Sequence, residues 1–119
     1  MLTIPKGLFL IKWDEVQGGV VHMKYPEDLE IPVNVVQQIQ ISHDFVESNI
    51  TFQEQDWNSI SHFNDSRSMI VGIVLNKFDD ASDFLVVLDE LNAELEKDHS
   101  EEELMEQLER IYEFSKTVF

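Results

Sequence analysis

The stretch GLFLIKWDEVQGGVVHMKYP, residues 7–26, decides the fold of this chain. Its first eight residues are rich in aromatic and branched side chains, and the glycine pair further on permits the positive φ of a tight hairpin turn. Residues 20–26 alternate like a strand with one buried face, with Val21, Met23 and Tyr25 on one side and Val20, His22 and Lys24 on the other. The sequence therefore opens with a β-hairpin. We expect its second strand at a sheet edge, because hairpin order leaves that strand with a single partner.

The segment after the hairpin changes from strand-like to helix-like spacing and back. Residues 32–46 open with a proline, which a first helical turn tolerates, and predict a helix with apolar positions at Val35, Val36, Ile39 and Val46. Few charges occur in this helix, so we expect part of its outer face to be covered. Residues 49–57 and 59–65 return to a period of two and predict two strands joined near residues 56–58.

The second half of the chain contains its most apolar segment and two amphipathic segments. MIVGIVLNKF, residues 69–78, is nearly continuous in apolar side chains, which is typical of a central strand covered on both faces. Residues 81–99 predict a helix. Its candidate caps are Asp79, Asp80 and Ser82, and its buried stripe is Phe84, Leu88, Leu91 and Leu95. We expect Leu88→Asp to unfold the domain and Glu94→Lys to be nearly silent.

The last predicted helix begins at a capping-box pattern. Ser100 and Glu103 have the required spacing, and an apolar face continues through Leu104, Leu108, Ile111 and Val118. The predicted order is therefore β-β-α-β-β-β-α-α with short connections over a single domain, residues 1–119. Strands joined by short turns run antiparallel, so the fold class is α+β with a five-stranded antiparallel sheet.

This order of elements resembles the longin domain family. The hairpin of residues 7–26, the strand pair that runs into MIVGIVLN, and the two closing amphipathic helices carry the resemblance over nearly the whole chain. Roadblock domains are similar but begin with a helix, whereas this chain begins with a hairpin. The resemblance implies one helix on one face of the sheet and two on the other. It also implies a non-enzymatic adaptor in small-GTPase regulation or vesicle traffic, which pairs with itself or with a sibling domain.

Charge and composition limit the classes of partner. The formal charge is −16, which repels nucleic-acid phosphates and anionic lipid headgroups and favours basic protein partners. We therefore expect a protein partner, either a small GTPase or another longin or roadblock domain, and neither nucleic-acid binding nor direct membrane insertion. The absence of cysteine suits a reducing compartment, so we expect a cytoplasmic location.

The residue patterns indicate no catalytic, cofactor or metal site. The four histidines include no pair at a spacing of three or four residues, and no GxxxxGK[ST] loop occurs. The adjacent pairs Ser61-His62 and His43-Asp44 do not make a triad, because neighbouring strand residues point to opposite faces. A small-molecule sensor built on a similar sheet remains the alternative to a protein-binding platform, and a sizeable apolar cavity beneath the sheet would favour it.

The candidate interface combines the edge strand, the first helix and a tryptophan at a strand end. Trp13 and Trp57 both lie beside predicted turns. Each is either buried in the core or exposed as an interface anchor. The candidate interface residues are Trp13, Val20, His22, Lys24, Tyr25, Val36, Gln37 and Gln40.

Overall fold

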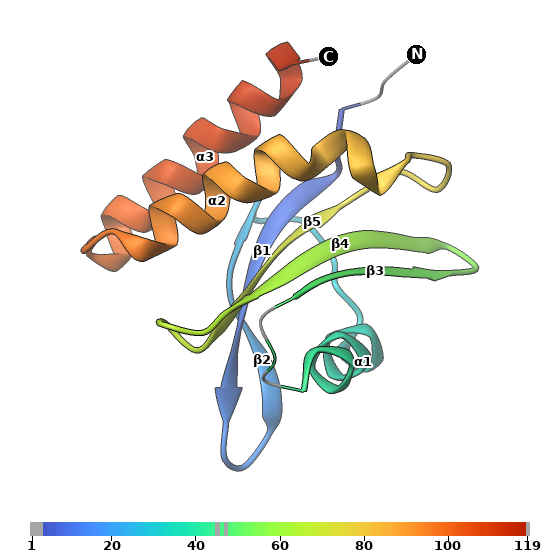
Figure 1. Cartoon of the computed structure of the whole chain (residues 1–119), viewed down its shortest axis with the longest axis vertical. Coiled ribbons are helices and arrows are strands. Elements are labelled where there is room, and N and C mark those ends of the chain that lie inside the picture. Colours follow the sequence, from blue (N-terminus) through green and yellow to red (C-terminus); the bar gives the residue numbers. More distant parts are fainter. Residues whose placement is uncertain (1–3, 45, 47, 119) are drawn as a thin grey trace.

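The computed structural model describes residues 4–44, 46 and 48–118 and confirms the predicted α+β class and order of elements. The antiparallel sheet has the strand order β2-β1-β5-β4-β3. One helix, α1, covers one face, and α2 and α3 cover the other (Figure 1). The bounds are β1 Gly7–Asp14, β2 Gly18–Tyr25, α1 Val33–His43, β3 Asn49–Glu54, β4 Trp57–Asn64, β5 Met69–Val74, a short 3₁₀ turn at Ala81–Phe84, α2 Leu85–Glu96 and α3 Glu101–Val118. Within the described residues, no helix is both long and apolar enough to span a membrane.

The two central strands, β1 and β5, supply both sides of the core. Along β1, Leu8 and Leu10 pack toward α2 and α3, while Phe9 and Ile11 pack toward α1. Phe9 pairs with Gly72 of β5, and a Cβ at position 72 would lie 2.1 Å from Cζ of the Phe9 ring. The glycine thus makes room for an aromatic ring in the middle of the sheet. The central position predicted for residues 69–78 is confirmed, although β5 ends at Val74.

The second strand lies at the sheet edge, as predicted, but its alternation is interrupted. A β-bulge shifts the register so that Leu10 pairs with Met23 and Ile11 pairs with Val21. Met23 therefore packs with the α2–α3 core, whereas Val21 packs with the α1 core. The prediction that Val21, Met23 and Tyr25 share one face is wrong, because the extra residue at the bulge moves Val21 to the opposite face.

Several predicted boundaries also differ from the structure. The helix predicted for residues 81–99 is a 3₁₀ turn followed by α2, which ends at Glu96. The first helix ends at His43, where Asp44 adopts a left-handed conformation, and Val46 beyond it is exposed rather than buried. The turn between β3 and β4 is shorter than predicted, because Trp57 already belongs to β4. Phe78 closes the apolar stretch of the sequence but is 92% exposed in the loop after β5.

The closing helices agree with their sequence signals. The predicted stripe on α2 is buried throughout, and the Asp80 side chain accepts a hydrogen bond from the Ser82 backbone N–H. At the start of α3 the Ser100 N–H donates to Glu103 Oε1 at 3.0 Å, and the Glu103 N–H donates to Ser100 Oγ at 3.2 Å. This reciprocal pair is the predicted capping box. The predicted apolar face of α3 is confirmed at Leu104, Leu108 and Ile111, which are buried. The side chain of Val118 lies outside the described part of the structure.

Glu94 occupies a position that the sequence analysis assigned wrongly. It is 6% exposed at the junction of α2 and α3. Its carboxylate contacts Lys97 Nζ at 2.8 Å, His99 Nε2 at 2.9 Å and Arg110 Nη2 at 3.2 Å. A lysine here would place a cation among these groups, so the expectation that Glu94→Lys is silent does not fit the structure.

Candidate functional site

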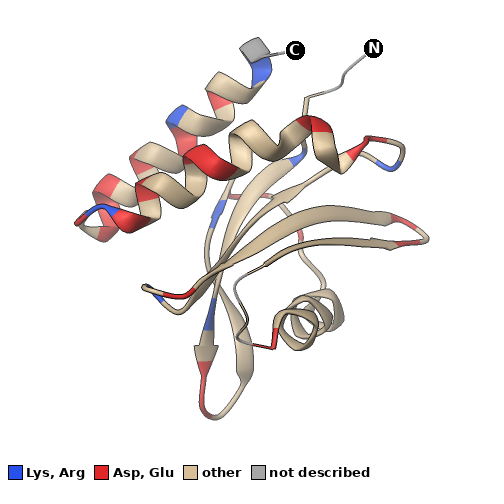
Figure 2. Cartoon of the chain, in the orientation of Figure 1, with Lys and Arg blue, Asp and Glu red and all other residues tan. Residues whose placement is uncertain are grey.

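The outward face of α1 is an uncharged surface with two large apolar side chains in an otherwise acidic chain. No Asp, Glu, Lys or Arg occurs in Val33–His43, so α1 is tan in Figure 2, whereas α2 and α3 carry several red acidic positions. Two large side chains of α1 point outward, Val33 at 76% exposure and Ile41 at 66%. Together with the exposed Asn34, Gln38 and Ser42, they form what we call the α1 outer face.

A groove of about 280 Å³ lies where α1 meets the sheet edge at β2. Gln37 Nε2 spans this junction and donates to the backbone oxygens of Gly19 at 3.0 Å and Gln17 at 3.3 Å. Gly19 permits a close approach of Gln40 in the next turn of α1, because a Cβ at position 19 would lie 3.1 Å from Gln40 Oε1. The groove is lined by Gln17, Gly19, Val20, Val21, Ile31, Val33, Val36 and Gln37.

Three of the predicted interface residues meet in this groove and two others lie near it. Val20, Val36 and Gln37 line it, although Val36 is only 4% exposed and belongs mainly to the core. Gln40 is buried against Gly19, and Trp13, opposite Gly19 in the hairpin, is 48% exposed. Trp13 thus has the partial exposure of an interface anchor, whereas Trp57 packs against the α1 core.

The other predicted interface residues turn toward the rest of the protein. His22 Nε2 lies 3.4 Å from a carboxylate oxygen of Glu101 at the start of α3. Tyr25 packs edge-on against the ring of Tyr112 with 5.5 Å between ring centroids. Lys24 donates a hydrogen bond to the backbone oxygen of Leu29. These three side chains therefore tie the edge strand to α3 and to the linker, and the structure does not bring them to the groove.

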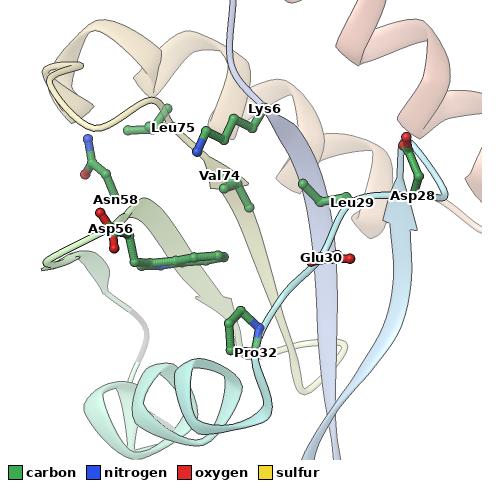
Figure 3. A pocket seen from close by; sticks show the side chains of 10 residues that line it. Lys6, Asp28, Leu29, Glu30, Pro32, Asp56, Asn58, Val74 and Leu75 are labelled. Atoms are coloured by element: carbon green, nitrogen blue, oxygen red, sulfur yellow. The ribbon is translucent and has the colours of Figure 1, made fainter.

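A second and larger cavity, of about 470 Å³, lies at the end of the sheet where β4 begins and β5 ends (Figure 3). We call it the end cavity. Asp56 and Asn58 lie on one side of it, and Leu29, Glu30 and Asp28 lie on the other. Its lining residues are Lys6, Asp28, Leu29, Glu30, Pro32, Asp56, Trp57, Asn58, Val74 and Leu75. The sequence analysis missed this site, because its residues come from separate segments with no common motif.

One wall of the end cavity contains an unusual polar group. Asn58 is 1% exposed, and its Nδ2 donates to the backbone oxygens of Asn76 at 2.9 Å and Asp79 at 3.0 Å. Those two acceptors fix the orientation of the amide, since only the nitrogen can donate. The amide oxygen, Oδ1, is buried without a hydrogen-bond partner among the described residues.

A buried histidine–serine contact links α1 to β4. His43 Nε2 lies 2.8 Å from Ser61 Oγ, and both side chains are buried. Burial, with a smaller contribution from the nearby His62, lowers the pKa of His43 to about 4. The sequence analysis considered these residues only beside their chain neighbours and so missed the contact. Because neither residue lines either cavity, we assign the pair to the packing of α1 on the sheet. The residues described contain no group of three or more side chains suited to hold a metal ion.

No protein-family model and no curated protein matches this chain. The sheet topology is compatible with a longin domain, but other α+β proteins share these features.

Proposed function

We propose that this chain is a longin-type, non-enzymatic platform that binds other proteins in small-GTPase regulation or vesicle traffic. The observation that carries the proposal is the α1 outer face. The chain has a formal charge of −16, yet an entire helix on its surface, Val33–His43, contains no Asp, Glu, Lys or Arg. Depletion of charge with exposed large apolar side chains is the composition of an interface core rather than of an ordinary solvated helix.

The partner that fits this face is a second domain of the same fold, either another copy or a sibling chain. Two strongly acidic domains repel each other wherever their acidic helices meet, and the α1 outer face is the region where that repulsion is weakest. Among the described strands β2 pairs only with β1, so its outer edge keeps backbone hydrogen-bonding groups for a partner strand, apart from the Gly19 oxygen that accepts a bond from Gln37. The paired platform would then present its remaining surface to a small GTPase.

The test compares an exposed isoleucine on the α1 side of the sheet with an exposed valine on the α2–α3 side. Ile41→Asp places a charge on the α1 outer face, and Val86→Asp does the same on α2, where Val86 is 57% exposed. We expect light scattering after gel filtration to show a dimer for the parent and for Val86→Asp, and a monomer for Ile41→Asp. Val86→Asp should keep the parental melting temperature, because its side chain is exposed. Ile41→Asp should lose only the stabilisation that dimer formation itself supplies, and its melting temperature should not depend on protein concentration.

The GTPase part of the proposal needs a separate measurement. The parent and Ile41→Asp serve as baits in a cytosolic extract, with GDP or a non-hydrolysable GTP analogue added, and retained proteins are identified by mass spectrometry. Retention of a small GTPase or of a domain of this fold by the parent, and its loss by Ile41→Asp, supports the proposal. A monomeric parent whose retained proteins are the same for both baits would refute it.

The end cavity gives the alternative, a small-molecule-binding domain, one specific observation in its favour. Its volume lies within the range typical of ligand sites. The cavity differs from the one expected for a sensor of this kind, however, because it lies at the end of the sheet rather than beneath it and contains several charged side chains.

A further inference from the structure

The groove between α1 and β2 has a mainly aliphatic lining beside an edge strand. Val20, Val21 and Ile31 are half-buried in it, and Val33 at its rim is 76% exposed. No charged side chain lines it among the residues that the structure describes. With a volume of about 280 Å³, the groove takes a few aliphatic side chains rather than a whole helix, whose diameter is about 10 Å or more.

Gln37 shows that the edge of β2 accepts hydrogen bonds from amide groups at this groove. Its Nε2 donates to the backbone oxygens of Gly19 and Gln17, as the backbone of an added strand would. Its Oε1 accepts no hydrogen bond from the described part of the chain. This oxygen is therefore an acceptor for an N–H group that enters the groove.

Gln40, one turn further along α1, keeps its whole side-chain amide unpaired. The residue is 5% exposed, and its side chain forms no hydrogen bond with a residue that the structure describes. Both amide atoms still reach solvent, because the only fully buried side-chain atoms without a partner in that part of the chain are His43 Nδ1 and Asn58 Oδ1. The amide lies against Gly19, which lines the groove. A mostly buried amide without a partner is destabilising, and a ligand that both donates and accepts would remove that cost.

An extended peptide backbone matches this arrangement of groups. It presents N–H and C=O groups in alternation, and every second side chain points to the same side. We infer that the groove between α1 and β2 binds an extended peptide segment of another protein. Aliphatic side chains of the peptide pack against Val20 and Val33, and its backbone bonds to the amides of Gln37 and Gln40. The site lies beside the α1 outer face and shares Val33 with it, but peptide binding does not depend on the pairing of two domains.

The charge of the chain determines the ends of the peptide. The sequence contains 24 acidic and 8 basic residues. Glu15 and Glu30 are exposed next to the segments that line the groove, and neither forms an ion pair with a described residue. An uncharged groove in a negative field favours a segment that is aliphatic in its middle and basic at its ends.

The direct test titrates the peptide acetyl-Lys-Thr-Val-Thr-Val-Thr-Lys-amide into the protein and measures the heat of binding. We expect a Kd of about 100 µM. A peptide with glutamate in place of both lysines should bind about tenfold more weakly or less still. The difference between the two peptides should shrink at high salt, because it arises from charge outside the groove.

Backbone methylation distinguishes strand addition from side-chain binding alone. Alternate N–H groups of an extended strand point to the same side, so only one of the two alternating sets faces the protein. One peptide carries N-methyl groups on both valines, and a second carries them on two threonines. We expect one of these peptides to lose affinity about tenfold or more and the other to bind like the unmodified peptide.

Substitutions inside and outside the groove provide matched controls. Val20→Ser together with Val33→Ser removes aliphatic contact area and should weaken peptide binding about tenfold. Val46→Ser together with Val86→Ser changes two exposed valines that do not line the groove, and it should leave the affinity unchanged.

Gln40→Met separates a binding role from a structural one. Methionine has a similar length but no amide, so the variant removes an unpaired polar group and should raise the melting temperature. Peptide affinity should nevertheless decrease about threefold, because the backbone of the peptide loses a partner. A residue with a structural role alone would change the melting temperature and leave the affinity as it is.

Several outcomes overturn the inference. No binding at millimolar peptide, equal affinity of the two N-methylated peptides, equal binding of the glutamate peptide, or unchanged affinity of the Val20→Ser, Val33→Ser variant would each do so. Light scattering with saturating peptide tests the competing occupant. If the peptide converts a dimer to a monomer, the groove belongs to the contact between two copies and the inference is wrong. Ile41→Asp should bind the peptide like the parent, so failure of the pairing surface and failure of this site are distinguishable.

Discussion

The α1 layer and the α2–α3 layer cover opposite faces of one sheet, yet they differ in how each helix is stabilised. Helix α3 starts with a reciprocal capping box and three acidic residues in its first turn. Acidic side chains stabilise this end, because the N-terminus of a helix carries a partial positive charge. Helix α1 has no side-chain cap bond and no acidic residue in its first turn. Its 11 residues are too few for a stable isolated helix, so α1 depends on packing against the sheet.

The two layers also differ in the charge of their exposed side chains. The outer side of the α2–α3 layer carries acidic side chains that water solvates, and its one buried carboxylate, Glu94, contacts Lys97, His99 and Arg110. The α1 layer leaves Val33 and Ile41 exposed without charges around them. The charged exterior of the α2–α3 layer is therefore suited to contact with water, whereas the uncharged exterior of the α1 layer is suited to contact with another protein.

The largest expected effect concerns the buried stripe of the α2–α3 layer. Leu88 is 1% exposed, so Leu88→Asp should lower the free energy of unfolding by more than about 4 kcal/mol and leave the protein largely unfolded. Val86→Asp on the same helix, at an exposed position, should cost less than about 0.5 kcal/mol. Thermal melts followed by circular dichroism measure both, and equal melts would show that the face of α2 is assigned wrongly.

The second effect tests whether the α2–α3 junction is held by its buried carboxylate. The pKa of Glu94 is lowered, chiefly by the hydrogen bond from Lys97. The hydrogen bond from His99 and the positive charge of Arg110 lower it further. Glu94→Lys should therefore destabilise the fold by about 3 kcal/mol. Glu90→Lys, an exposed position one turn earlier, serves as the matched control in urea denaturation. If the two variants unfold at the same urea concentration, the ion cluster contributes no stability.

The third effect distinguishes the layers by pH. The pKa of His43 lies near 4 in the folded protein and near 6.5 in the unfolded chain, so the unfolded state binds more protons between these values. Stability from neutral His43 is complete above about pH 6.5 and decreases as the pH falls, by about 2 kcal/mol at pH 5. As the pH falls, hydrogen exchange should show that α1 loses protection first. The α2–α3 junction should keep its protection to lower pH, because the pKa of Glu94 is lowered and its carboxylate stays ionised there.

A variant without the titrating ring provides the control for that measurement. In His43→Gln the difference in unfolding free energy between pH 6.5 and pH 5 should shrink relative to the parent, whatever its absolute stability. An unchanged pH dependence would mean that His43 is not the group responsible.

The smallest effect concerns the local signal that α3 has and α1 lacks. Ser100→Ala removes the hydroxyl that accepts the Glu103 N–H and should cost about 1 kcal/mol. Asn34→Ala at the exposed start of α1 should cost less than about 0.5 kcal/mol, since no cap bond is lost there. Chemical denaturation of both variants checks the difference, and a greater cost at Asn34 would reverse the comparison.

Much of the fold could be predicted because its signals are local. The aromatic and branched side chains of β1, the glycine-containing hairpin, the apolar stretch of β5 and the Ser100–Glu103 spacing each act within a few residues, and each appears in the structure. The errors arose where two elements meet. The bulge that moves Val21 to the α1 face depends on strand pairing, and the burial of Glu94 depends on Arg110 in the next helix.

The candidate sites were harder to predict for the same reason. The uncharged character of α1 is visible in the letters of the sequence, and so is the edge position of β2. The end cavity is not, because Lys6, Glu30, Asp56 and Asn58 are far apart along the chain and share no motif. The contact between His43 and Ser61 joins residues 18 positions apart and has no sequence signal either.

The sequence by itself determined the order of elements, the α+β class, the central position of residues 69–78 and the overall acidic charge. Only the tertiary structure decided which side chains of β2 reach which face, which polar atoms remain unpaired and where the two cavities lie. Secondary structure follows from periodicity and caps that act over one or two turns. Pairing, burial and cavities depend on contacts between distant segments, which form only when the whole chain packs.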